Sequence, residues 1–172
     1  MNAPKILVRE DEEAKKRRLI PTPDLGWYLL GAVGLVFAIV GGIDIALVWY
    51  PSNLGNPEFE FGSVAASFNN LPLVSLGLTM WVAGGVARGQ KWVVRVGATM
   101  LIILALLIVL GAVLFLTNVP MALKAKMEPI IMTGLKKGIS KTLIQSAAYP
   151  VVLFYVAVKA WRHSLASTTE AP

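Results

Sequence analysis

Apolar residues occur along this chain in long stretches that are separated by short polar segments. A helix that crosses a bilayer needs about 20 mostly apolar residues. Residues 25–50 and 93–117 meet this requirement, and each stretch carries only one charged residue. Residues 142–161 form a further stretch, in which Pro150 predicts a kink and Lys159 lies near enough to the end to reach the headgroups. These patterns predict three transmembrane helices.

The remaining apolar segment, residues 64–87, is a weaker candidate. Its most apolar part, residues 71–87, is short for a span and contains glycine and proline. However, no charged residue occurs between Phe61 and Ala87, so a helix that begins outside the bilayer can still cross it. We therefore predict an all-α integral membrane protein with four transmembrane helices in a single domain, residues 25–162.

The composition of the whole chain agrees with a membrane protein. Of its 172 residues, 56% are hydrophobic and 15% are charged, whereas an ordinary soluble domain has about 25% charged residues. The chain has no cysteine and one histidine, so we predict no metal centre built on thiolates or several histidines, and no bound cofactor. The sequence also lacks a phosphate-binding loop and a nucleophile motif. These observations argue against an enzyme.

The cations predict which side of the membrane each polar segment faces. Cytoplasmic segments carry an excess of Lys and Arg. Four spans with both chain ends in the cytoplasm place 11 of the 16 Lys and Arg inside, and omitting residues 64–87 gives the same ratio. Only the four-span arrangement places every Arg inside. We therefore predict a multi-pass protein of the bacterial cytoplasmic (inner) membrane, with residues 1–24 as a charged cytoplasmic leader and 163–172 as a cytoplasmic tail.

The net charge of +6 does not predict nucleic-acid binding in this arrangement. The cations are divided between the two sides of the membrane and are not interleaved with aromatic residues, as they are in nucleic-acid interfaces. We expect membrane lipids and another membrane protein, or further copies of the chain, as partners.

The first outer segment, residues 51–62, contains alternating acidic and aromatic residues. These are Glu58, Phe59, Glu60 and Phe61. One interpretation is an outer docking element for a periplasmic or membrane partner. The other, which we favour, is the start of the second helix, because Pro57 suits a first turn and carboxylates interact well with the positive helix end.

The second outer segment, residues 118–141, contains five Lys and one Glu among large apolar residues. Pro129 suits the first turn of a long helix that continues into the fourth span and extends into the periplasm. A cationic amphipathic helix can lie on a lipid surface. Through Lys136 and Lys137 it can instead bind an anionic polymer or an acidic periplasmic partner. The interpretation that we favour is a collar of Lys side chains at the interface.

Small residues recur at intervals of four in two of the predicted helices. Helices in lipid associate through close packing of such residues. The predicted packing positions are Gly34, Ala38, Gly42 and Ala46 in the first helix, and Gly134, Gly138, Thr142 and Ser146 in the fourth. We expect a compact bundle, with any spare face available to a partner or a second copy.

One acidic residue, Asp44, lies inside a predicted span. Ionisable groups within a membrane are costly and are candidates for function. Possible polar partners are Lys141 at the outer side and Asn69 and Asn70 of the second helix. Three roles remain open: a structural polar lock, which we favour, a transport or proton-binding site, and a protonated side chain that faces lipid.

The segment from residue 54 to residue 80 also supports a family resemblance. The residues that carry it are Asn56, Pro57, Glu58, Glu60 and Phe61, followed by Leu71, Pro72, Leu76, Gly77 and Leu78. With these motifs the chain resembles, over residues 25–145, the HpsJ-like membrane proteins associated with hormogonium polysaccharide and cyanobacterial exosortase systems. Phe59 replaces the usual Trp, and the polar stretch is shorter and poorer in Gln than in that family. The resemblance implies a non-enzymatic accessory in envelope polysaccharide production or export.

Two functional hypotheses follow from these patterns. The first is an accessory or scaffold subunit of an inner-membrane complex, because packing motifs are abundant and catalytic groups are absent. The alternative is a small oligomeric transporter or channel that uses Asp44.

Overall fold

The computed structural model describes residues 25–124 and 129–169. These residues form the helices α2 (Leu25–Val48), α3 (Pro57–Ala87), α4 (Lys91–Lys124) and α5 (Pro129–Thr169). Each of these four helices is long and apolar enough to cross a membrane. The structure therefore confirms an all-helical chain with four candidate spans, including the weaker second one, and it is compatible with a multi-pass membrane protein. The predicted leader, residues 1–24, lies outside the described residues.

Helix α3 begins earlier than expected, and a side-chain cap stabilises its first turn. Asn56 Oδ1 accepts hydrogen bonds from the backbone N–H groups of Glu58 (3.0 Å) and Phe59 (3.4 Å). Pro57, the first helical residue, has no N–H that needs a partner. Glu58 and Glu60 lie in the first turn, where the positive end of the helix favours carboxylates. The structure shows the start of a helix in this segment, as the favoured interpretation predicted, and the docking interpretation stays a prediction.

The connection between α3 and α4 is a tight turn that depends on one glycine. Gly89 has a φ of +65°, a left-handed conformation that other residues adopt only at a cost. Its N–H donates to the carbonyl of Val86 (3.0 Å), and the N–H of Gln90 donates to that of Gly85 (2.9 Å). These bonds satisfy carbonyls that the end of a helix leaves free. The turn brings α4 back alongside α3.

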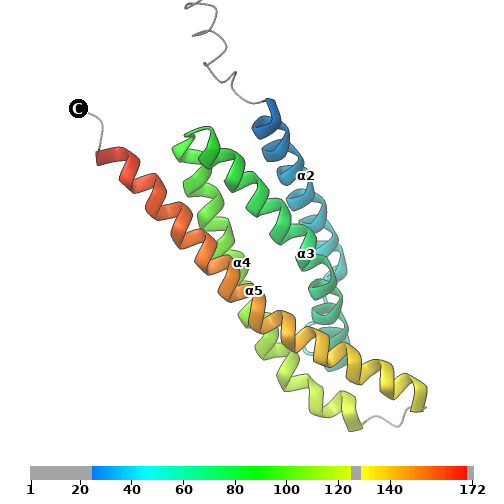
Figure 1. Cartoon of the computed structure of the whole chain (residues 1–172). Coiled ribbons are helices and arrows are strands. Elements are labelled where there is room, and N and C mark those ends of the chain that lie inside the picture. The colour runs from blue at the N-terminus through cyan, green and yellow to red at the C-terminus, as the bar shows by residue number, and fades with distance from the viewer. Residues whose placement is uncertain (1–24, 125–128, 170–172) are drawn as a thin grey trace, which may run out of the picture.

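The helices form an open bundle around α3 (Figure 1). Among the described helices, α2 packs against α3 alone, whereas α4 and α5 pack against each other and both contact α3. The start of α2, the α3–α4 turn and the end of α5 lie at one end of the molecule, which we call the terminal end (Figure 1). The end of α2 and the start of α3 lie at the opposite end, which we call the loop end. Figure 1 also shows α5 changing direction along its length, and this helix contains Pro150.

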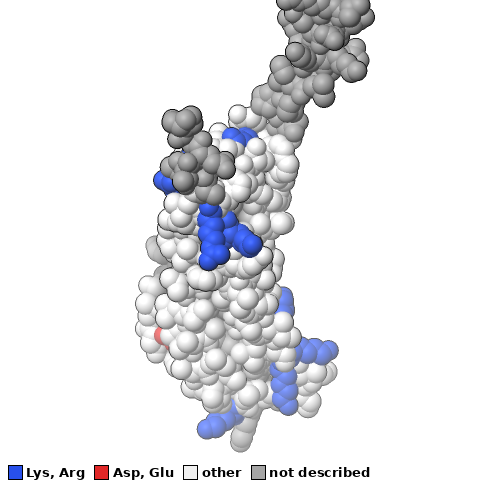
Figure 2. Space-filling view, turned by 60° about the vertical axis from the view of Figure 1, so that its left-hand side comes forward, with Lys and Arg blue, Asp and Glu red and all other residues white. Residues whose placement is uncertain are grey.

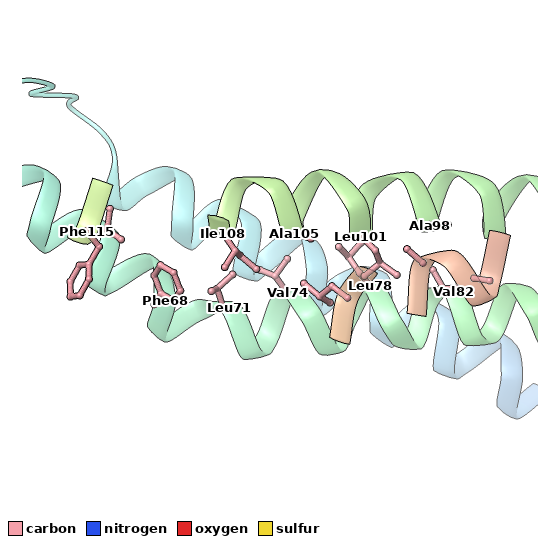
Figure 3. Close-up of a cluster of buried hydrophobic side chains, with 14 of the residues drawn as sticks. Phe68, Leu71, Val74, Leu78, Val82, Ala98, Leu101, Ala105, Ile108 and Phe115 are labelled. Atoms are coloured by element: carbon pink, nitrogen blue, oxygen red, sulfur yellow. The ribbon is translucent and has the colours of Figure 1, made fainter. Parts of the chain in front are cut away.

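A line of buried apolar side chains joins α3 to α4 (Figure 3). Leu78 lies beside Leu101, and Leu71 lies beside Ile108 nearer the loop end. Helix α5 adds Leu153 and other buried residues to the same cluster. Large apolar side chains also cover much of the outer surface of the helices, as expected where lipid replaces water.

Helices α2 and α3 approach each other through glycines. A Cβ atom on Gly34 would lie 2.6 Å from the carbonyl oxygen of Gly77, and one on Gly84 would lie 2.9 Å from the carbonyl oxygen of Trp27. Both contacts are with backbone atoms, which cannot move aside as a flexible side chain can. Only glycine permits this separation of the two helices.

The predicted packing face of α2 is correct in its first half and wrong in its second. Gly34 is buried and Ala38 packs against the core, but Gly42 and Ala46 are exposed. A Cβ atom on Gly42 would meet nothing within 4 Å, whereas Gly41 is buried against α3. Because a helix has 3.6 residues per turn, each step of four residues rotates the position by about 40°. A strict four-residue spacing therefore leaves the contact face.

Of the predicted packing positions of α5, Thr142 is buried, whereas Gly134 and Gly138 do not contact the other described helices. Gly134 and Gly138 are exposed, and a Cβ atom on either would meet nothing within 4 Å. The buried positions in this part of α5 are Ile139 and Thr142. Because successive residues are about 100° apart around a helix, a helix that buries Ile139 turns Gly138 outward.

Candidate functional site

The polar residues predicted to surround Asp44 are not brought together as one site. Asp44 is half-buried near the loop end of α2. No hydrogen bond or ion pair joins it to Asn69, Asn70 or Lys141 in the described part of the chain. For Lys141 the reason is the arrangement of the helices, because this residue lies on α5, which α2 does not contact among the described elements.

Two members of that predicted set do meet. Lys141 Nζ donates a hydrogen bond of 2.7 Å to Asn69 Oδ1. This bond joins α5 to α3 at an exposed position. The pair therefore acts as a link between helices, and Asp44 has no part in it.

The acidic and aromatic residues at the start of α3 hold the loop end together. Glu60 accepts hydrogen bonds from the N–H of Gly55 (2.9 Å) and from Asn118 Nδ2 (3.2 Å), so it joins the loop before α3 to α4. Phe61 stacks on Phe115 of α4 with 4.8 Å between the ring centroids. These contacts anchor the side chains of Glu60 and Phe61, which are both half-buried, and Phe61 also borders an open hollow beside α4.

The other two residues of this segment differ from each other. Phe59 is half-buried and packs its edge against Trp49, with the ring centroids 6.1 Å apart. Trp49 Nε1 in turn donates to Ser67 Oγ (3.0 Å). Glu58 is exposed. Of the four residues predicted to form the docking surface on this segment, Glu58 is exposed and the other three are half-buried, and their role in docking stays a prediction.

Because α2 rests on α3 alone, grooves remain on both sides of α3. The first, which we call the α2–α4 groove, has a volume of about 280 Å³. Its walls are Ile45 and Trp49 of α2 and a row of apolar residues of α4, including Leu107, and its floor includes Phe68 and Leu71 of α3. The polar atoms that reach it, on Trp49 and Ser67, are bonded to each other. The Trp49 N–H therefore needs no partner inside the groove, and the groove is an apolar surface.

The second groove, which we call the α2–α5 groove, lies nearer the terminal end and has a volume of about 530 Å³. The residues that line it are Trp27 of α2; Thr79, Val82, Ala83, Val86 and Ala87 of α3; and Tyr155, Val156, Lys159, Ala160 and His163 of α5. It combines an apolar floor with basic side chains of α5. Neither groove is evident in the sequence, because each depends on which helices are neighbours.

The predicted Lys-rich surface lies along one side of α5. Lys136, Lys137 and Lys141 are exposed and line an open hollow of about 570 Å³, together with Thr133, Ser140, Ile144 and Gln145. The Oε1 atom of Gln145 is buried and has no hydrogen-bond partner. The start of α5 therefore presents cations to the surroundings at the loop end.

The described residues offer binding surfaces and no arrangement of metal-ligating groups. Within residues 25–124 and 129–169, no three His, Cys, Asp or Glu side chains lie close enough together to hold a metal ion. The described acidic residues, Asp44, Glu58 and Glu60, all lie toward the loop end. Comparisons with protein families, curated proteins and solved structures find no match for this chain.

Proposed function

We propose that this protein is a non-enzymatic accessory or scaffold subunit of a complex in the bacterial inner membrane, with both ends in the cytoplasm. The observation that carries the proposal is the single attachment of α2, which leaves an apolar groove between α2 and α4. We propose that this groove receives a transmembrane helix of a partner protein.

The shape of the α2–α4 groove supports a helix as its occupant. In lipid, helices associate through close packing, because the tails outside are as apolar as the side chains. A helix in the groove would contact two walls and a floor instead of one flat face. Leu104, Leu107 and Leu114 supply one wall, Ile45 supplies the other, and Phe68 supplies the floor. The packing gain is therefore larger here than on the outer surface of α4.

The pathway follows from the resemblance to HpsJ-like proteins. We propose a role in envelope polysaccharide production or export, with Lys136 and Lys137 facing the periplasm. In that position, exposed cations at the start of α5 suit an anionic polymer or an acidic periplasmic partner.

Site-specific photo-cross-linking in the native membrane tests the helix-docking proposal. A photoreactive residue at Leu107, which lines the groove, should form a discrete adduct with one membrane protein. The matched control is Leu106, which is similarly exposed (64% against 57%) but does not line the groove. Adducts with lipid alone at Leu107, or the same protein adduct at both positions, would contradict the proposal. An adduct of twice the chain mass would identify a second copy as the occupant.

A second candidate function is an oligomeric transporter or channel. The observation that favours it is Asp44, which is half-buried in a membrane-spanning helix and is not bonded to the polar residues predicted for it. An intramembrane acid without such a partner suits a transport site. Several copies would have to line the pathway together, since the α2–α4 and α2–α5 grooves are both open to the surface.

A further inference from the structure

The lining of the α2–α5 groove changes from apolar along α3 to basic near the terminal end. Its floor on α3 consists of Val82, Ala83 and Val86, with Thr79 at one end. The hydroxyl of Thr79 donates to the carbonyl of Ser75 (2.7 Å), so this donor is used within the helix. The groove is therefore apolar along α3.

The α5 wall of the same groove is basic and aromatic near the terminal end. Lys159 and His163 are four residues apart and both are exposed. The ammonium group of Lys159 lies 5.7 Å from the centre of the Tyr155 ring. Trp27 lines the opposite wall. Trp and Tyr prefer the depth of the headgroups, so these rings place the basic end of the groove at the membrane surface.

Among the described residues, the charges around this end of the groove are unbalanced. No acidic side chain lines the groove among the described residues, and the acids of that part of the chain all lie toward the loop end. Cations occur at the terminal end on three parts of the chain: Arg88 just after α3, Arg95 of α4, and Lys159 and Arg162 of α5. Figure 2 shows the Lys and Arg side chains of one face gathered toward the two ends of the molecule, with mostly uncharged atoms between them. An anion is therefore the favoured partner for the basic end.

We infer that the α2–α5 groove binds an anionic phospholipid. One acyl chain lies on the floor formed by Val82, Ala83 and Val86, between α2 and α5. The phosphate lies at the terminal end, where Lys159 and His163 donate to it. Basic pockets between transmembrane helices bind anionic headgroups in this way. The lipid also fills the space on the side of α3 where α2 and α5 do not meet, and this role is independent of the accessory function proposed above.

Native mass spectrometry of the full-length protein tests the headgroup contact. The detergent-purified protein is mixed with phosphatidylglycerol or with phosphatidylcholine of identical acyl chains, and retained lipid is counted. We expect preferential retention of phosphatidylglycerol, and a decrease of about fivefold in its affinity for Lys159→Gln, the usual effect of one surface cation. The matched control is Arg162→Gln, which removes the same charge from the same part of α5 but does not line the groove.

A second pair of variants tests the acyl-chain contact. Ala83→Phe fills the floor of the groove and should reduce retention of both lipids, whereas Ala32→Phe, at an exposed position of α2 outside the groove, should not. Equal retention of the two lipids by the natural chain would overturn the inference. So would an equal loss for Lys159→Gln and Arg162→Gln, which would indicate a diffuse surface charge. Unchanged lipid binding by Ala83→Phe would also overturn the inference, because the lipid would then bind outside this groove.

Discussion

Asp44 illustrates how the position of one residue depends on the neighbours of its helix. In the sequence, it is the one charged residue of residues 25–50, and Asn69, Asn70 and Lys141 were reasonable partners. In the structure, Lys141 bonds to Asn69 instead, because α2 is kept apart from α5 by its attachment to α3. A polar lock between these helices is therefore not formed by Asp44.

The substitution Asp44→Asn separates the two functional hypotheses at the residue scale. Under the accessory function, we expect assembly and the Leu107 cross-link to be unchanged, because Asp44 is bonded to none of its predicted partners. The transporter function is tested by measuring the flux of protons or ions into proteoliposomes that contain the purified protein. Flux by the natural chain that disappears in Asp44→Asn, with assembly intact, would replace the accessory function with the transporter.

Helix boundaries show what could be predicted at the scale of elements. Apolar stretches indicated four helices correctly, because hydrocarbon imposes length and composition on any span. The helix ends differ from the predicted ones, because capping residues and turns, and not the apolar stretches, determine where a helix begins and ends. Asn56 starts α3 before the apolar stretch, and the turn at Gly89 follows the end of α3. Helix α4 likewise continues to Lys124, beyond the apolar residues.

The packing faces were predicted less well, for a geometric reason. A four-residue repeat indicated that α2 packs closely, and Gly34 does so. The same repeat predicted a further contact at Gly42. The buried residue there is Gly41, because the helix has 3.6 and not 4 residues per turn. In α5 the glycines face outward, because larger residues on another face fill the contact with α4. The choice of neighbours for each helix, and hence both grooves, depends on tertiary contacts that no local pattern encodes.

The contact between α2 and α3 leads to a prediction about the stability of the bundle. A Cβ atom on Gly77 would lie 2.5 Å from the backbone nitrogen of Ala38. We expect Gly77→Val to force α2 away from α3 and to cost about 1–3 kcal/mol, as overpacking commonly does. The melting temperature in detergent should fall. The control is Gly42→Val, since a Cβ atom there meets open space; an equal fall for both variants would contradict the glycine contact.

At the scale of the whole molecule, the terminal end and the loop end differ in their charged residues. The described acidic residues lie toward the loop end, and Arg88, Arg95 and Arg162 lie toward the terminal end. Lys residues occur at both ends, but every Arg of the described residues lies at the terminal end. Because cytoplasmic segments are enriched in Lys and Arg, this distribution of Arg favours a cytoplasmic terminal end. Even numbers of spans place both chain ends on one side, and Figure 1 shows the start of α2 and the end of α5 together.

Cysteine labelling in intact cells tests this orientation. The natural chain has no cysteine, so a single introduced thiol is the only site for a membrane-impermeant maleimide. Ser52 is exposed in the loop between α2 and α3, and Gln90 lies in the α3–α4 turn. We expect Ser52→Cys to be labelled in intact cells and Gln90→Cys to be labelled only after permeabilisation. The reverse result would mean that the terminal end faces the periplasm, and the basic end of the α2–α5 groove would then lie in the outer leaflet. Labelling of both positions in intact cells would mean that α3 does not cross the bilayer.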